Sequence, residues 1–446
     1  MQPFKFYLVT DTHYFDRSFS DGGEAYKEYM LTEQKCSAET AAINEAVFKV
    51  LAESEEADTV IIPGDLSFNG EKLSHESFIK LLAGLKEAGK KIYVITAGHD
   101  FKEHPFAFRG AERYEPENVK RADLFDMYYE YGFKDAIAVD RESLSYVAQL
   151  ADGIRLLALN NDGDCKNYTY TARQIEWILQ QTKKGREDGQ LMIVINHFPL
   201  LPANPVFELV GDAVMKNWDA VTTMLADEGV HLCLTGHMHN QSIKFKDTEK
   251  GSRIWDVCTS SLIGYPALYR LITITDGHHA DIKSIPVPKF DWDMEGLTND
   301  EYFARQFDMM INTYLDFMEN DPARLLRKFG VKEAPEILKK IIPVIGKTLN
   351  KATLGGIGKK MLFKCDPAIK DVLFRDYAKR LVRGIFAGNA SYVEGTPEYD
   401  FMMKLLGRFR PVLAIVGKKT GRNVFDLVKY TMGHYGVDEN NTVIEW

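Results

Sequence analysis

The sequence predicts an α/β fold followed by an all-helical C-terminal domain. Along residues 1–290, short apolar runs bounded by turn residues alternate with stretches of helical spacing, which is typical of α/β units. Beyond that region only helical periodicity continues, and the balance of charge changes. At 446 residues the chain is longer than one hydrophobic core usually organises, so we expect two domains, residues 1–290 and 291–446.

Seven apolar runs are expected to form strands. They are short and rich in Val, Ile, Leu and aromatic residues, as buried strands are. They comprise residues 4–10, 59–63, 91–96, 191–195, 231–235, 254–259 and 269–275.

Helical stretches lie between these runs. In residues 38–52 the apolar side chains recur every three or four positions, which predicts one buried helix face. Residues 74–88, 171–181 and 213–226 repeat the pattern, so we expect all four helices to complete α/β units with the strands.

The C-terminal part differs in charge and in periodicity. Residues 301–446 carry 24 Lys and Arg against 17 Asp and Glu, whereas the preceding part carries 31 against 47. Aromatic residues are not interleaved with the basic ones in the manner of a nucleic-acid-stacking surface, so we expect solvated helix faces and no nucleic-acid partner. A surface that steers phosphates or binds nucleic acid is the alternative. Helices are expected at residues 303–317, 336–349, 369–385 and 399–406.

Five fragments that follow the apolar runs carry metal-binding side chains. Asp and His together suit borderline divalent ions, and two ions sharing one carboxylate can hold a phosphorus centre and turn a bound water into hydroxide. Because side chains alternate along an extended segment, we expect Asp11 and His13 to point the same way, and likewise His237 and His239. The fragments are Asp11-Thr12-His13, Gly64-Asp65, His99-Asp100, Asn196-His197 and Gly236-His237-Met238-His239.

In this order the fragments resemble the pattern of the calcineurin-like metallophosphoesterases, which is D-x-H, G-D-x-x-(D/N), G-N-H-(D/E), H and G-H-x-H. The resemblance covers about residues 1–290. It implies a four-layer sandwich in which two packed mixed β-sheets are flanked by helices. It also implies a hydrolase that acts on phosphoric ester bonds.

The resemblance further implies a role for each motif residue. Asp65 would bridge two divalent or trivalent metal ions, with Mn, Fe or Zn as the candidates. His99 would face the leaving oxygen of the substrate, oriented by Asp100, and Asn69 would fix its loop or support the ligands. The first metal would be held by Asp11, His13, Asp65 and His239, and the second by Asp65, His197 and His237.

One position departs from the family pattern. The third fragment has Gly98 where the family has Asn, so the second metal lacks an amide ligand and the substrate phosphate lacks a polar contact. We therefore expect the second site to bind metal more weakly than the first. A water, a backbone carbonyl or one of three asparagines can fill the vacancy; the candidates are Asn160, Asn161 and Asn196.

Residues 11–14 and 64–71, with a helical C-terminal domain, are most similar to bacterial class III cyclic nucleotide phosphodiesterases. The first functional hypothesis is therefore hydrolysis of a phosphodiester in a small or cyclic nucleotide-like molecule. A phosphomonoesterase is the alternative. A degenerate module that binds a phosphoester without turnover is a third possibility, although such a module has no need of a leaving-group acid such as His99.

Composition bears on the location of the protein. No apolar run approaches the roughly 18 residues of a membrane helix, and no charged and apolar leader precedes the first expected strand. The five cysteines are odd in number and scattered, which favours reduced thiols. We expect a cytoplasmic protein without a membrane span, or an extracellular one if a leader has been removed.

Overall fold

The computed structural model describes residues 2–162, 168–209, 213–328, 336–389, 392–432 and 437–446. The chain divides into two compact units. The first contains residues 1–27, 35–303 and 437–446, and the second contains residues 28–34 and 304–436. The boundary predicted at residue 290 falls between strand β14 (His279–Pro286) and helix α7 (Asn299–Asn320).

A six-stranded mixed sheet in the first unit has the order β15-β14-β13-β1-β2-β3. β1 (Phe4–Leu8), β2 (Thr59–Pro63) and β3 (Lys91–Ile95) are parallel neighbours, so their carboxyl ends meet at one edge of the sheet. On its other side β1 pairs antiparallel with β13 (Leu268–Ile274), and β14 and β15 (Asn441–Glu445) continue the sheet in antiparallel register.

A seven-stranded mixed sheet has the order β11-β12-β10-β9-β8-β7-β6. Its centre is parallel and consists of β8 (Ile154–Ala158), β9 (Leu191–Ile195), β10 (Val230–Thr235) and β12 (Arg253–Cys258). The antiparallel strands at its edges are β6 (Ala136–Asp140), β7 (Ser145–Ala151) and β11 (Ser242–Asp247).

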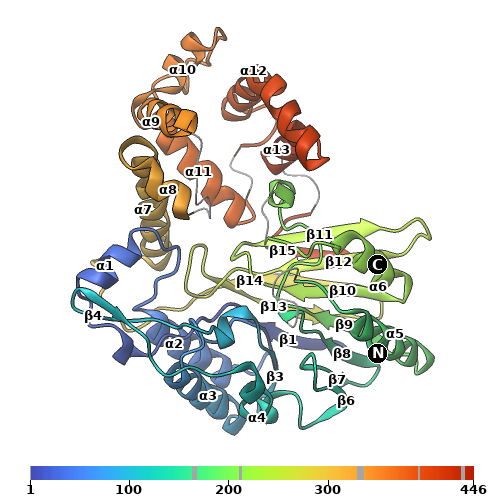
Figure 1. Ribbon diagram of the computed structural model, residues 1–446. Coiled ribbons are helices and arrows are strands. Elements are labelled where there is room, and N and C mark those ends of the chain that lie inside the picture. The colour runs from blue at the N-terminus through green and yellow to red at the C-terminus, as the bar shows by residue number, and fades with distance from the viewer. Residues whose placement is uncertain (1, 163–167, 210–212, 329–335, 390–391, 433–436) are drawn as a thin grey trace. The chain divides into compact units, whose positions relative to one another are not determined.

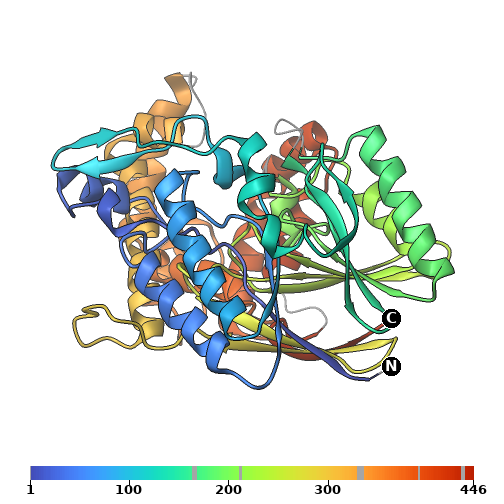
Figure 2. The same cartoon turned by 90° about the horizontal axis from the view of Figure 1, so that it is seen from below.

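The two sheets pack face to face, and helices cover their outer faces. Along β9, Ile193 and Ile195 belong to the core that both sheets share, whereas Met192 and Val194 belong to a second core that also contains residues of α5 and α6. Figures 1 and 2 show α2 and α3 beside the first sheet and α5 and α6 beside the second. The predicted four-layer fold is confirmed. These helices are α2 (Thr40–Glu53), α3 (Lys72–Glu87), α5 (Ala172–Glu187) and α6 (Trp218–Asp227).

The second unit is helical and has its own core, which includes Leu354, Tyr377 and Phe401. The helix expected at residues 369–385 begins only at Phe374, because turns occupy the residues before it. In the part of the chain that the structure describes, no helix is both long and apolar enough to cross a membrane. The helices after α7 are α8 (Pro322–Lys328), α9 (Glu336–Lys351), α10 (Leu354–Lys360), α11 (Phe374–Phe386), α12 (Pro397–Thr420) and α13 (Val424–Met432).

The C-terminal region is mostly helical, as expected, but its last residues form strand β15 and not a helix. Ile444 is buried while its neighbour Val443 is 60% exposed, which is the alternation of a half-buried strand. The Trp255 indole donates a hydrogen bond to the Glu445 carbonyl, and Arg270 donates to the Glu439 carbonyl. The end of the chain is therefore part of the first unit.

Smaller elements complete the first unit or join it to the second. They are α1 (Glu24–Met30), β4 (Ala107–Arg109), β5 (Glu112–Tyr114), α4 (Leu124–Met127) and the 3-10 turn η2 (Gly98–Phe101). Four cysteines are free thiols, of which Cys36, Cys233 and Cys258 are buried; Cys165 lies outside the described residues.

Candidate metal centre

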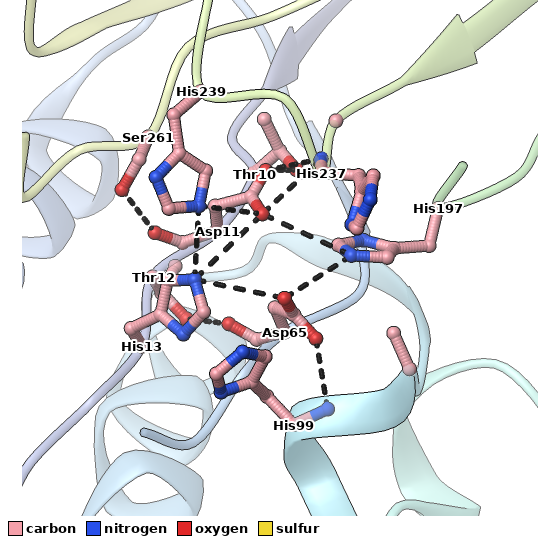
Figure 3. A network of polar contacts seen from close by, with 12 residues as sticks. Thr10, Asp11, Thr12, His13, Asp65, His99, His197, His237, His239 and Ser261 are labelled. Carbon is pink, nitrogen blue, oxygen red and sulfur yellow. Dashed lines mark hydrogen bonds and ion pairs between the residues drawn. The ribbon is translucent and has the colours of Figure 1, made fainter. Parts of the chain in front are cut away.

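The predicted site residues lie in loops that follow the carboxyl ends of β1, β2, β3, β9 and β10. Three of these strands belong to one sheet and two to the other, so the site forms where the edges of the sheets meet. Figure 3 shows the imidazoles of His13, His197 and His239 directed toward the carboxylates of Asp11 and Asp65.

Two adjoining groups of ligand atoms are formed. In the first group, formed by Asp11, His13 and His239, the His239 Nε2 atom lies 3.3 Å from Asp11 Oδ1 and 3.1 Å from His13 Nε2. In the second group, formed by Asp65, His197 and His237, the His197 Nε2 atom lies 3.1 Å from Asp65 Oδ2. The structure thus brings all six predicted metal ligands together.

Asp65 lies between the two groups. Its Oδ2 atom is 3.6 Å from His13 Nε2 of the first group and 3.1 Å from His197 Nε2 of the second. A carboxylate in this position can contact an ion in either group. This is the placement expected of a bridging ligand.

The convergence of the ligands comes from turns and not from strand alternation. Five of the six ligands have a left-handed backbone conformation, which is uncommon for residues other than glycine and concentrates at functional sites. The expectation that Asp11 and His13 share a face because their segment is extended is therefore wrong, since β1 ends at Leu8. The φ angles are 50° at Asp11, 38° at His13, 51° at Asp65, 67° at His237 and 53° at His239.

Two glycines make room for the ligands. A Cβ atom at Gly236 would lie 2.3 Å from Asp11 Oδ2 and 2.1 Å from Thr10 Oγ1. At Gly64, where φ is +96°, a Cβ would lie 2.7 Å from His197 Nδ1. Both motif glycines are thus needed because ligand side chains pass directly over their backbone.

The carboxylates and imidazoles of the site have the composition of a metal-binding site. Burial by itself disfavours charge on His197, but the carboxylates of Asp65 and Asp11 outweigh it and raise the pKa of this imidazole to about 10. Burial also disfavours charge on Asp65, yet the imidazoles of His197 and His99 bring the pKa of this carboxyl well below its usual range. Two carboxylates and four imidazoles fit borderline divalent ions, and the buried His197 Nε2 atom is directed at the Asp65 carboxylate.

Loop residues hold the ligands in place. The Asp11 carboxylate accepts hydrogen bonds from Thr10 Oγ1 at 2.6 Å and from the His237 backbone N–H at 3.0 Å. Ser261 donates to the Asp11 carbonyl, and the His197 Nδ1–H group donates to the Pro63 carbonyl. Neither Thr10 nor Ser261 was predicted from the sequence. The position of Thr10 beside the first fragment was a usable signal, whereas Ser261 had none.

His99 lies beside Asp65, but Asp100 does not orient it. The His99 backbone N–H donates to Asp65 Oδ1, and its Nδ1–H donates to the Phe68 carbonyl at 2.5 Å. The Asp100 carboxylate instead accepts hydrogen bonds from the backbone N–H groups of Ser67 and Ala97, both at 2.8 Å. The expectation that Asp100 orients the His99 imidazole is not met by a hydrogen bond between them, because Asp100 joins the loops after β2 and β3.

The second ring nitrogen of His99, Nε2, does not contact the Phe68 carbonyl. This nitrogen lies 3.3 Å from the Lys102 ammonium, which must be the donor. Burial brings the pKa of His99 well below its usual range despite the nearby Asp65, and the positive charges of Lys35 and Lys102 lower it further. His13, Asp65 and His99 also offer three ligand atoms within 4.8 Å of one another, so His99 can approach an ion as well.

The vacancy at Gly98 remains open. A Cβ atom there would meet nothing within 4 Å. Two of the three candidate asparagines are committed elsewhere. Asn160 donates to Thr96 and accepts from the Asp162 N–H group, and Asn196 donates to the Phe198 carbonyl and accepts from Tyr170. The third candidate, Asn161, donates to the Tyr168 carbonyl.

Among the described residues, Asn69 makes no hydrogen bond with the metal ligands. Its backbone N–H donates to Glu71 Oε2 at 3.0 Å, and its buried side-chain Nδ2 atom has no hydrogen-bond partner within the described residues. The backbone contact fits the expected loop-fixing role.

Comparisons with known proteins place the chain in a family. Residues 4–241, more than half of the chain, match the family model of the calcineurin-like phosphoesterases. Among curated proteins no match was found. Solved structures similar to this chain include a dimetal phosphatase from Danio rerio, with 13% identity, 64% of this chain and 97% of that chain covered, and a TM-score of 0.45. A purple acid phosphatase from yellow lupin (Lupinus luteus) has 14% identity, 64% and 52% coverage, and a TM-score of 0.44. With the motifs in order and both ligand groups assembled, the match shows that this chain belongs to the calcineurin-like phosphoesterase family and is a metallophosphoesterase.

Proposed function

We propose that this metallophosphoesterase hydrolyses a phosphodiester of a small, nucleotide-like molecule with two metal ions from among Mn, Fe and Zn. The observation that carries the reaction type is the pair of adjoining ligand groups with Asp65 between them. Bound there, two ions supply a hydroxide nucleophile and neutralise charge that develops on the phosphoryl oxygens. The preference for a diester rests on the similarity of residues 11–14 and 64–71 to class III cyclic nucleotide phosphodiesterases.

The chain's own residues position the substrate and move the proton. Because the Phe68 carbonyl takes the Nδ1–H of His99, Nε2 is the ring atom that can give a proton to the leaving oxygen. The pKa of His99 is held well below its usual range by burial, so protonation at Nε2 needs the negative charge of a bound phosphoryl group nearby. In the structure Nε2 accepts a hydrogen bond from the Lys102 ammonium, so this contact must open before Nε2 carries a proton toward the leaving oxygen.

A phosphomonoesterase is the second candidate, and one observation favours it. Two lysines, Lys35 and Lys102, add positive charge beside His99. Positive charge in a buried site favours the dianion of a phosphomonoester over the monoanion of a diester. A module without turnover is disfavoured because both ligand groups and His99 are present.

A substrate panel tests the proposal. We expect the protein with Mn²⁺ to cleave bis-p-nitrophenyl phosphate and at least one cyclic nucleotide, and EDTA to abolish both activities. The same panel includes p-nitrophenyl phosphate and nucleoside monophosphates. Faster turnover of monoesters than of every diester would establish the second candidate, and the absence of metal-dependent turnover would leave only phosphoester binding.

A further inference from the structure

Lys35 is a buried cation next to the metal centre. The residue as a whole is 7% exposed, and its ammonium lies 4.7 Å from the centre of the Phe68 ring. The Phe68 ring in turn packs edge-on against His13, and His13 packs against His99. The positive charge of Lys35 contributes to the low pKa of both histidines, so the ammonium is within electrostatic reach of both.

The ammonium of Lys35 has no anionic or carbonyl partner. Within the described residues it makes no hydrogen bond and no ion pair, and it lies over the Phe68 ring. A cation–π contact leaves the N–H donors of an ammonium unused, and the Lys35 Nζ atom is not fully enclosed by the protein. The Lys35 ammonium is therefore available to bind an anion.

Lys90 shows what a buried structural lysine looks like in the same unit. It is 6% exposed, nearly the same as Lys35. Its ammonium, however, donates to the carbonyls of Ser54 and Ala57 at 2.5 and 2.9 Å and lies 3.7 Å from an Asp58 carboxylate oxygen. The contrast indicates that Lys35 is not placed to satisfy the fold.

The backbone of Lys35 is anchored to the site. Lys35 forms an isolated bridge with Gly264, and the next residue donates its N–H to the Ile263 carbonyl. The same loop contains Ser261, whose hydroxyl donates to the carbonyl of the metal ligand Asp11. The position of the lysine is thus coupled to that of the first ligand group, which is the kind of preorganisation that binding a reacting group requires.

We propose that the Lys35 ammonium binds a non-bridging oxygen of the substrate's phosphoryl group and takes over the phosphate contact that Gly98 cannot make. The ammonium then gains the anion that the fold does not provide, and the phosphoryl group is held between Lys35 and the metal centre. This inference deepens the proposed function by naming a substrate-binding residue. It requires only that the site bind a phosphoryl group, so it can hold even if diester hydrolysis fails.

Inorganic phosphate is the probe. We measure its dissociation constant by isothermal titration calorimetry on the Mn²⁺-loaded full chain, with metal content and melting temperature determined for each variant. In Lys35→Met, which keeps the aliphatic stem, phosphate should bind about tenfold to a hundredfold more weakly, as for loss of a hydrogen bond to a charged group. Metal content should not change, and the melting temperature should change little, because the Lys35 ammonium makes no hydrogen bond or ion pair with the described residues and the aliphatic stem is kept.

Two further variants complete the design. Lys35→Arg keeps a cation and should retain most of the phosphate affinity. Lys90→Met, the matched control, should lower the melting temperature, because it leaves two carbonyls without their donor. It should leave phosphate binding unchanged, because Lys90 precedes the amino end of β3 whereas the site follows the carboxyl ends of the strands. Phosphate affinity of Lys35→Met within twofold of the wild type, with both metals bound, overturns the proposal, and so does a loss of affinity that occurs only together with loss of metal. If Lys35→Met does not fold, Lys35→Gln takes its place, with the same expected loss of phosphate affinity and the same results overturning the proposal.

Discussion

Replacing Gly236 with alanine should disable the metal centre through a single methyl group. The new Cβ would lie 2.3 Å from Asp11 Oδ2, and ordinary contact begins at 3.4 Å, so the carboxylate oxygen must withdraw by about 1 Å. That movement is opposed by the hydrogen bonds that this oxygen accepts from Thr10 and from the His237 N–H. Metal sites tolerate deviations of only about 0.2 Å, and a displacement of about 1 Å in a catalytic group can cost about a hundredfold in rate.

Gly98→Ala is the matched control, because the same methyl group there meets nothing within 4 Å. We expect Gly236→Ala to lose metal from the first ligand group and to lose at least about a hundredfold in kcat/KM on bis-p-nitrophenyl phosphate. Its free energy of unfolding should fall by about 1–3 kcal/mol. Gly98→Ala should keep its activity within twofold of the wild type. Elemental analysis, steady-state kinetics and denaturant unfolding measure the three effects. Two bound metals and near-normal activity in Gly236→Ala would refute the reasoning that Asp11 has no room to move.

Other changes test the remaining assignments. Gly98→Asn restores the family amide in open space and should tighten binding of the second Mn²⁺ by about tenfold without loss of activity; an unchanged affinity in a Mn²⁺ titration would show that the amide does not reach the ion. His99→Ala should retain both metals and slow esters with poor leaving groups about a hundredfold or more, while p-nitrophenyl esters, which hardly need an acid, slow much less; equal slowing of both in steady-state assays would remove the acid role. Burial raises the pKa of Asp256 to about 6 from an ordinary value of 3.8, so the folded state holds this proton more tightly and the stability due to Asp256 declines as pH rises from about 4 to about 6. Asp256→Asn should therefore be most destabilising near pH 4, and the difference from the wild type should shrink by up to about 3 kcal/mol by pH 7 in denaturant unfolding; a constant difference would contradict the shift.

The central strands and the candidate ligands could be predicted from the sequence. The apolar runs at residues 59–63 and 191–195 form strands with those bounds, because a continuous buried run has few other conformations open to it. The helix at residues 40–53 follows from its apolar spacing in the same way. The site residues were identifiable because each lies directly after such a run, and parallel strands bring their carboxyl ends to one edge.

Only the tertiary structure decided how these residues are held. The left-handed backbone at Asp11 and His13 has no local sequence cause, since it is maintained by contacts such as the hydrogen bond from Ser261, 250 residues away. The partner of the His99 imidazole is a backbone carbonyl, which no motif encodes. Lys35 looks like any other lysine in the sequence, and its burial against Phe68 appears only when distant loops meet. Local patterns report which face of an element is buried, whereas contacts between distant segments depend on the packing of the whole unit.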